Sequence, residues 1–335
     1  MRNIEFPAIL YYMETRYLVP NDYMADPAVH VFNGRLYIYP SHDWESGKVE
    51  VQGDGGHFDM KDYHVFSMDD VENGKVTDHG VVLDVKDIPW AGRQLWDCDV
   101  AHKDGKYYMY FPLKDKNDIF RIGVAIAGKP EGPFVPQGDP IRGSYSIDPC
   151  VFEENGRYYM YFGGIWGGQL QRYRDNKALE SAVFPPDNEP NIPARVVKLS
   201  EDMLQFAEEP RSVIIIDRDG KPLTNGDNKR RFFEASWMHK YNGKYYFSYS
   251  TGDTHLLCYA TGDNPYGPFT YQGVILTPVV GWTTHHSIVE YKGKWYLFHH
   301  DSVPSGGKTH LRSLKVTELT YSADGTIQTI EGGGK

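Results

Sequence analysis

The stretch that decides the fold is ADPAVHVFNGRLYIYPSHD, residues 25–43. It runs from an Asp-Pro step through a short apolar segment and an Asn-Gly pair into an alternating aromatic segment. An Asn-Gly pair between two such segments is typical of a tight β-hairpin, and the aromatic segment has the period of two of a β-strand. A second copy, IDPCVFEENGRYYMYFGG, occupies residues 147–164. The repetition predicts that one hairpin design is used more than once.

The hairpin glycine serves as a ruler for finding further copies. Five copies carry it, each followed by a strand rich in Tyr or Trp, at Gly34, Gly105, Gly156, Gly243 and Gly293. The intervals between them leave room for about four strands per repeat. We therefore predict an all-β fold, a five-bladed β-propeller, as a single domain over residues 1–335. A β-sandwich or barrel is the alternative, and residues 176–184 are the one candidate for a short helix.

Ionisable residues recur at a fixed distance from these glycines. Eight residues before them stand Asp26, Asp97, Asp148, Ala235 with Glu234 beside it, and His285. In a propeller the innermost strand of each blade lines a central channel, so the residues that open those strands face a common hub. A single Asp-Pro step is usually just a turn. Acids gathered at one hub would repel one another, and such a cost usually reflects function.

The bulk composition excludes several partners. The 335 residues carry 45 acidic and 35 basic side chains, a formal net charge of −10, without a cluster of Lys and Arg. Nucleic acid and anionic membranes are therefore not expected as partners, and no apolar run is long enough to span a bilayer. Three scattered cysteines, Cys98, Cys150 and Cys258, predict free buried thiols and a cytoplasmic location, since the N-terminal residues make a poor signal peptide.

Paired carboxylates in an aromatic-lined hollow are the machinery of glycoside hydrolysis. One carboxylic acid protonates the leaving oxygen, and a second, ionised, activates a water on the opposite face of the sugar. A third carboxylate nearby keeps the acid protonated near neutral pH by repulsion.

The chain resembles glycoside hydrolase family 43, the five-bladed β-propeller β-xylosidases, α-L-arabinofuranosidases and arabinanases. The resemblance rests on MADP (residues 24–27), WDCD (96–99), SIDPCVF (146–152), FFEASW (232–237) and TTHHS (283–287), spread over nearly the whole chain. It implies that Asp26 is the general base, Glu234 the general acid and Asp148 the carboxylate that tunes the acid. It also implies inversion at the anomeric carbon.

Further residues are candidates for binding the sugar and a cation. Trp96 stands just before the second hub position, and its indole offers an apolar face to a sugar ring, so it would line the sugar subsite, with packing in the core as the alternative. The resemblance implies roles for two more residues. Arg312 would contact sugar hydroxyls near the acids, or be an ordinary surface arginine. His285 would hold water or a divalent cation, calcium in relatives, or form a hydrogen bond in the channel without metal. No organic cofactor is implied.

Two residues are less constrained. Asp97 departs from the pattern WAPD found in many relatives and adds a fourth acid. It is a structural hydrogen-bonding group, a contact to a sugar hydroxyl or a further modulator of the acids. Trp166, flanked by glycines, is expected on a loop, where it could form the far wall for the next sugar.

We therefore expect an inverting, exo-acting enzyme that releases L-arabinofuranose, D-xylose or both from short oligosaccharides derived from xylan or arabinoxylan. Since the chain is too short for the C-terminal sandwich of some β-xylosidases, its length slightly favours arabinofuranosidase or dual activity. The alternatives are an endo-acting arabinanase of the same family, a retaining fructan hydrolase and a non-catalytic carbohydrate-binding propeller. The sequence indicates no oligomeric state.

Overall fold

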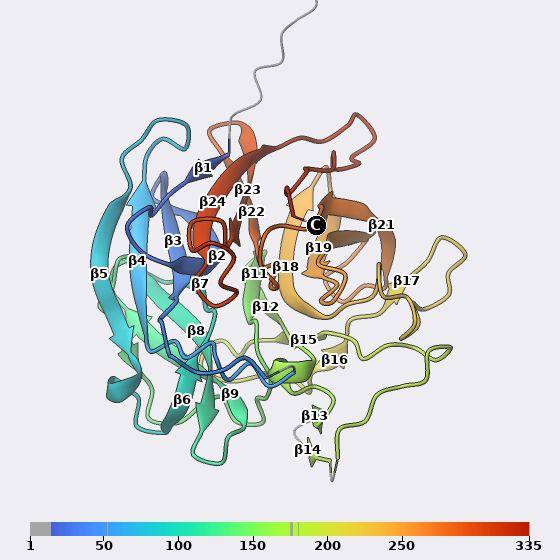
Figure 1. Cartoon of the computed structure of the whole chain (residues 1–335), viewed down its shortest axis with the longest axis horizontal. Coiled ribbons are helices and arrows are strands. Elements are labelled where there is room, and N and C mark those ends of the chain that lie inside the picture. Colours follow the sequence, from blue (N-terminus) through green and yellow to red (C-terminus); the bar gives the residue numbers. More distant parts are fainter. Residues whose placement is uncertain (1–14, 52, 175–176, 180, 335) are drawn as a thin grey trace, which may run out of the picture.

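Five sheets are arranged around a common axis (Figure 1), and their strands pair antiparallel except for β17 (Ile215–Ile216) with β21 (Phe269–Leu276). The computed structural model describes residues 15–51, 53–174, 177–179 and 181–334. The innermost strands β2, β7, β11, β18 and β22 contact one another in a closed ring. A ring of five sheets is a five-bladed β-propeller, as the repeated hairpins predict.

Each blade is built mainly from consecutive strands. The first holds β2 (Met24–Phe32), β3 (Arg35–His42), β4 (Asp62–Met68) and β5 (Thr77–Asp84). The second holds β6 (Ala91–Leu95), β7 (Asp99–Lys103), β8 (Lys106–Asp115), β9 (Phe120–Ala127) and β10 (Val135–Pro136). The third holds β11 (Cys150–Glu154), β12 (Arg157–Phe162), β15 (Arg195–Lys198) and β16 (Arg211–Ser212).

The fourth blade holds β17 (Ile215–Ile216), β18 (Glu234–Tyr241), β19 (Lys244–Ser250), β20 (Leu257–Gly262) and β21 (Phe269–Leu276). The fifth holds β22 (Ser287–Tyr291), β23 (Lys294–Asp301), β24 (Ser313–Leu319) and β1 (Arg16–Tyr17). Outside the blades lie the 3₁₀ turns η1 (Val85–Asp87) and η2 (Trp166–Gly168) and the short pair β13 (Tyr173–Arg174) and β14 (Lys177–Ala178).

The five hairpin glycines confirm the ruler drawn from the sequence. All have positive φ, between 73° and 79°, and the residue before each has φ between 46° and 53°. Two successive left-handed residues are the geometry of a type I′ turn, which matches the twist of the strands it joins. A Cβ added at any of these glycines would meet nothing within 4 Å, so backbone conformation rather than space favours glycine here.

The ring is closed by the N-terminal strand. Strand β1 pairs antiparallel with β24, so the first strand of the chain is the outermost strand of the last blade. Neighbouring blades are also tied at the hub by the buried carboxylate of Asp99. It accepts hydrogen bonds from the backbone N–H of Val151 at 2.6 Å and contacts the His30 Nε2 at 2.5 Å, which links the second blade to the third and the first.

The backbone is kinked where the acids enter the hub. Asp26, Asp148 and Ala235 all have left-handed φ, at 47°, 58° and 63°. Residues with a Cβ adopt this region at a cost of about 1–3 kcal/mol, and such strain gathers at functional sites. In the fourth blade the kink falls on Ala235, at the same distance from the hairpin glycine as the two Asp residues, and a bulge between Glu234 and Trp237 accompanies it.

Two smaller predictions have definite outcomes. The three cysteines are free and buried, as expected. The short helix expected at residues 176–184 is wrong in the part that is described: Lys177–Ala178 forms strand β14, and residues 179 and 181–184 are not helical, while Asn176 and Glu180 lie outside the described residues. No helix among the described residues has the length and apolarity needed to cross a membrane.

Candidate active site

One hollow at the hub collects the residues singled out in the sequence. Its volume, open mouth included, is about 770 Å³. It is lined by side chains from all five blades, among them Asp26, Trp96, Asp97, Asp148, Trp166, Glu234, His285 and Arg312. The structure thus brings together every site residue that the sequence analysis named.

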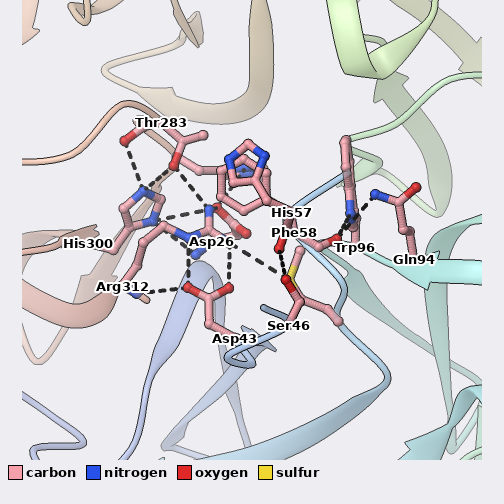
Figure 2. A network of polar contacts seen from close by, with 12 residues as sticks. Asp26, Asp43, Ser46, His57, Phe58, Gln94, Trp96, Thr283, His300 and Arg312 are labelled. Carbon is pink, nitrogen blue, oxygen red and sulfur yellow. Dashed lines mark hydrogen bonds and ion pairs between the residues drawn. The ribbon is translucent and has the colours of Figure 1, made fainter. Parts of the chain in front are cut away.

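Arg312 joins two buried carboxylates at one side of the hollow (Figure 2). Its NH1 donates to Asp26 Oδ1 at 2.7 Å, while its Nε and NH2 form a fork with Asp43 at 2.8 and 2.7 Å. A bidentate pair of this kind fixes the guanidinium plane as well as its position. Arg312 is 3 % exposed, so the interpretation as a surface arginine is wrong.

This ion pair decides the protonation of Asp26. Burial alone would raise the pKa of its carboxyl, but the positive charge of Arg312, aided by the nearby His300 and His285, lowers the pKa to about 2. Asp26 is therefore ionised at neutral pH. A buried carboxylate held in this state is suited to accept a proton from water.

Glu234, in the same hollow, has the opposite tendency. Burial raises its pKa well above the usual value, and the negative charges of Asp148 and Asp26 raise it further. Arg312 opposes this shift without overcoming it. Glu234 therefore keeps its proton to a higher pH than an ordinary glutamate does, which suits its carboxyl to donate a proton.

Asp148 and Asp97 form a coupled pair beside Glu234. Burial raises the pKa of both groups, and the two side chains hydrogen-bond to each other, which requires a shared proton. The Asp148 Oδ2 also accepts the backbone N–H of Ala235 at 2.5 Å. Since Ala235 follows Glu234 directly, this bond fixes Asp148 next to the backbone that carries the acid.

Two histidines flank Asp26 on the fifth-blade side. His285 Nδ1 lies 3.8 Å from the Asp26 carboxylate. His300 Nδ1 accepts the backbone N–H of Asp26 at 3.1 Å, and its Nε2 donates to the carbonyl of Thr283 at 3.0 Å. Burial, together with the charge of Arg312, lowers the pKa of His300 to about 4, so this ring is neutral at neutral pH. Its hydrogen bond to the N–H of Asp26 holds the left-handed backbone of that residue in place.

Trp96 forms one wall and is itself anchored. Its indole Nε1 and the Gln94 amide both donate to the carbonyl of Phe58, at 2.8 and 3.2 Å (Figure 2). A Cβ on Gly55 would lie 2.6 Å from the Trp96 ring, so a glycine is needed for this close approach. Trp96 is both packed and lining the hollow, which joins the two alternatives of the sequence analysis.

A cluster of aromatic rings also lines the hollow. Trp166, on η2, stacks on Trp282 with ring centroids 5.5 Å apart and meets Phe233 edge to face at 5.3 Å. The segment between β3 and β4 crosses the face of the molecule towards η2 (Figure 1), where Gly53 packs against the Trp166 side chain. The described residues of this segment that line the hollow are Glu50, Val51, Gly53, Gly55, His57, Phe58 and Met60.

Sequence reasoning missed several functional residues. Asp43 ends the very stretch that decides the fold, and Trp282 stands three residues before His285, yet neither falls on the hub register. His57 lines the hollow, is 4 % exposed, and has no hydrogen-bond partner for either ring nitrogen among the described residues. Such an unsatisfied polar group on a pocket wall is suited to a water or a sugar hydroxyl.

Comparisons with known proteins identify the family to which the chain is similar. A family model, "Glycosyl hydrolases family 43", matches residues 18–327. A "Xylosidase/arabinosidase" of Bacteroides ovatus is 78% identical over 320 residues, covering 95% of this chain and 98% of that protein. A "Beta-xylosidase" of Xylanibacter ruminicola is 64% identical over 321 residues, covering 95% and 100%.

A solved β-xylosidase structure superposes with a TM-score of 0.94 at 75% identity, covering 96% of this chain and 99% of that one. A β-xylosidase/α-arabinofuranosidase from a compost metagenome, solved with xylotriose in a calcium-free form, has a TM-score of 0.93 at 63% identity, covering 95% and 98%.

The raised pKa of Glu234 carries a stability cost that can be measured. Its ordinary pKa of 4.5 applies to the unfolded chain, which releases the proton above that pH while the folded protein retains it. The folded state therefore loses stability as pH rises from 4.5 towards the raised pKa, by up to about 1.4 kcal/mol per pH unit. Glu234→Gln removes this titration, so we expect the variant to gain stability over the wild type with increasing pH.

Urea unfolding from pH 4 to pH 8 tests this expectation. Glu209→Gln, at an exposed position, is the matched control and should follow the wild type. A stability difference between Glu234→Gln and wild type that stays constant with pH would show that the carboxyl of Glu234 is ionised in the folded state.

Proposed function

This chain belongs to glycosyl hydrolases family 43, and we propose that its hollow binds the terminal sugar of a short xylan- or arabinoxylan-derived oligosaccharide and hydrolyses the bond behind it with inversion. The chain is an exo-acting glycoside hydrolase of the β-xylosidase/arabinofuranosidase type. The observation that carries the catalytic proposal is that the pKa of Asp26 is lowered and the pKa of Glu234 is raised within one hollow.

The proposed reaction uses these two groups in one step. Glu234 donates its proton to the glycosidic oxygen as the bond from that oxygen to the anomeric carbon breaks. Asp26 accepts a proton from the water whose oxygen forms the new bond to the anomeric carbon on the opposite face. A single displacement of this kind inverts the anomeric centre, and it requires the two carboxyl groups to stand roughly 6.5–9.5 Å apart. The cycle ends when Asp26 returns its proton to solvent and Glu234 regains one.

Asp148 and Asp97 are proposed to set the proton affinity of the acid. The charge of Asp148 raises the pKa of Glu234, and its bond to the Ala235 N–H keeps it in place. The proton that Asp148 shares with Asp97 limits the charge of the two carboxyl groups together to about −1, which limits their repulsion of the other acids in the hollow. Asp97 thus acts on the sugar through Asp148 and Glu234.

The walls of the hollow are proposed to hold the sugar by complementary surfaces. Trp96 offers an apolar face to the ring C–H groups, and the unsatisfied His57 offers its ring nitrogens to the sugar hydroxyls. The N–H groups of Arg312 are already engaged by protein atoms, so we propose that Arg312 acts on the sugar through Asp26. The stacked Trp166 and Trp282 lie where the next sugar would leave the pocket. Xylopyranose and arabinofuranose present similar hydroxyls, so we propose that the enzyme releases both.

Chain length does not favour arabinofuranosidase, contrary to the sequence-based expectation. This chain covers 100% of the relative named "Beta-xylosidase", so a short propeller without an added sandwich carries that name. We propose D-xylose as a principal product for this reason. Free, buried thiols support a cytoplasmic location, where imported short oligosaccharides rather than polymers would be the substrates.

A divalent cation is proposed beside the acids. One ligand atom each from Asp97, Asp148 and His285 lies within 4.8 Å of the others. Among the described residues that line the hollow, the only Lys or Arg is Arg312, which is already paired with Asp26 and Asp43. A bound ion would displace the proton that Asp97 and Asp148 share and take over its role of offsetting their charge. Calcium prefers six to eight oxygen ligands, of which these carboxylates and water would be the source. The ion would supply positive charge next to the reacting groups.

The reaction type is tested by a panel of p-nitrophenyl glycosides together with proton NMR of the first product. We expect both β-D-xylopyranoside and α-L-arabinofuranoside to be cleaved, and the first sugar released from the β-xyloside to be the α-anomer, because a single displacement inverts. Initial release of β-xylose would contradict the assignment of Asp26 as a base acting through water.

The acid and base roles make different demands on the leaving group. Glu234→Ala should reduce hydrolysis of xylobiose by roughly 10²–10⁴-fold but that of aryl xylosides with good leaving groups far less, because these need little protonation. Asp26→Ala should reduce both substrates strongly, since water activation is always required. Steady-state kinetics on the two substrate classes separates the roles. Equal losses for Glu234→Ala on both substrates would refute its role as the acid.

Chelation tests the cation. Enzyme stripped of metal should regain thermal stability and activity on addition of Ca²⁺, since a ligand that binds only the folded state stabilises it by about 2.7 kcal/mol at 100 times its dissociation constant. The shift in melting temperature should be absent in His285→Ala. If verified metal-free wild type does not respond to Ca²⁺ in either measurement, the cation proposal is wrong.

A further inference from the structure

A second group of metal-binding side chains lies outside the hollow, in the first blade. One ligand atom each from His42, Asp62 and His64 lies within 4.8 Å of the others. Their side chains are 7, 11 and 14 % exposed. His42 ends strand β3, and Asp62 and His64 stand at the start of β4, so the group sits where the two strands meet the segment of residues 43–61.

Further carboxylates hold the two imidazoles in place. His42 Nδ1 contacts Asp62 Oδ1 at 2.5 Å, and its Nε2 lies 3.4 Å from the Asp22 carboxylate. His64 Nδ1 contacts Asp78 at 3.1 Å. Imidazoles oriented by carboxylates are the usual surroundings of a bound transition metal, because the second contact fixes the ring and raises its basicity.

The balance of charge at this group favours a cation. Three carboxylates, from Asp22, Asp62 and Asp78, surround two imidazoles. The ammonium group of the adjacent Lys61 lies 5.9 Å from the centre of the Trp44 ring, in a cation–π contact. A dication would therefore enter a site whose carboxylates exceed its fixed positive charge.

We propose that His42, Asp62 and His64 form a site for a transition-metal dication such as Zn²⁺, separate from the catalytic hollow. Two imidazoles and one carboxylate match the ligand preferences of Zn²⁺ and Co²⁺ rather than those of Ca²⁺, which prefers an all-oxygen shell. Zinc bonds of about 2.0–2.2 Å require His42 and Asp62 to part from their present contact by roughly 1 Å. A water completes the shell on the exposed side.

The position of the site gives the ion a role. Residues 43–61 leave the first blade at His42, contribute Gly55, His57 and Phe58 to the wall of the hollow, and return at Asp62. An ion bound by both ends of this segment closes its loop and so restricts its motion. We infer that metal binding stiffens the pocket wall that carries Gly55, which packs on Trp96.

Cobalt titration of the metal-depleted enzyme tests the site directly, because Co²⁺ with two imidazole ligands has a visible absorption. The test variant is His64→Ala, and the matched control is His79→Ala on the neighbouring strand β5, whose ring contacts Ser67 instead. We expect wild type and His79→Ala to bind one Co²⁺ more than His64→Ala, or to bind it roughly 10- to 100-fold more tightly. Any ion held near His285 is common to all three proteins and cancels in the comparison.

Equal Co²⁺ stoichiometry, affinity and spectrum in wild type and His64→Ala would overturn the proposal. Should His64→Ala not fold, as judged by circular dichroism, Asp62→Asn replaces it with the same expected loss. The role of the ion is tested by tryptic cleavage after Lys48, which should slow several-fold with Co²⁺ in wild type and His79→Ala only. Unchanged cleavage in wild type saturated with Co²⁺ would overturn the inferred stiffening.

Discussion

The chemistry of the hollow depends on one ion pair, that between Arg312 and Asp26. Among the described residues that line the hollow, Arg312 is the only Lys or Arg, against four acids at the hub and Glu50 at the mouth. Because its guanidinium is bound by Asp43 as well, it cannot turn towards Glu234 or Asp148. The one fixed positive charge thus lowers the pKa of Asp26, while burial and the charges of Asp148 and Asp26 raise the pKa of Glu234.

The fold maintains this arrangement of acids although the arrangement destabilises the folded state. Buried acids that repel one another and left-handed backbone at Asp26, Asp148 and Ala235 both destabilise the folded state. The closed ring offsets these terms with an extensive apolar core and with ties such as that of Asp99 between inner strands. A stable ring of blades around a strained site is expected where selection acts on the geometry of the site rather than on its stability.

Repetition explains why so much of this could be predicted. The five hairpin glycines and the residues eight positions before them carry the fold and the hub, and they are visible in sequence because each blade repeats the same local geometry. Other features occur only once in the chain, so no repeat in the sequence reveals them: Asp43, His57 and the closing strand β1. Counting eight residues back from the hairpin glycine gives Ala235 rather than Glu234, because the feature that repeats is the left-handed backbone, which in the fourth blade falls on Ala235. A bulge between Glu234 and Trp237 accompanies it, and the side chain in the hollow is that of the preceding residue, Glu234.

The end of strand β3 shows how one local rule serves two sites. Successive side chains of a strand point to opposite faces, and His42 and Asp43 are consecutive. Asp43 therefore turns to Arg312 at the hub, while His42 turns to Asp62 and His64 within the blade. Any displacement of this strand end moves both contacts together, since no flexible residue separates them. The carboxylate that holds Arg312 and a member of the histidine group are thus neighbours in sequence, at the base of the segment of residues 43–61 that contributes to the lining of the hollow.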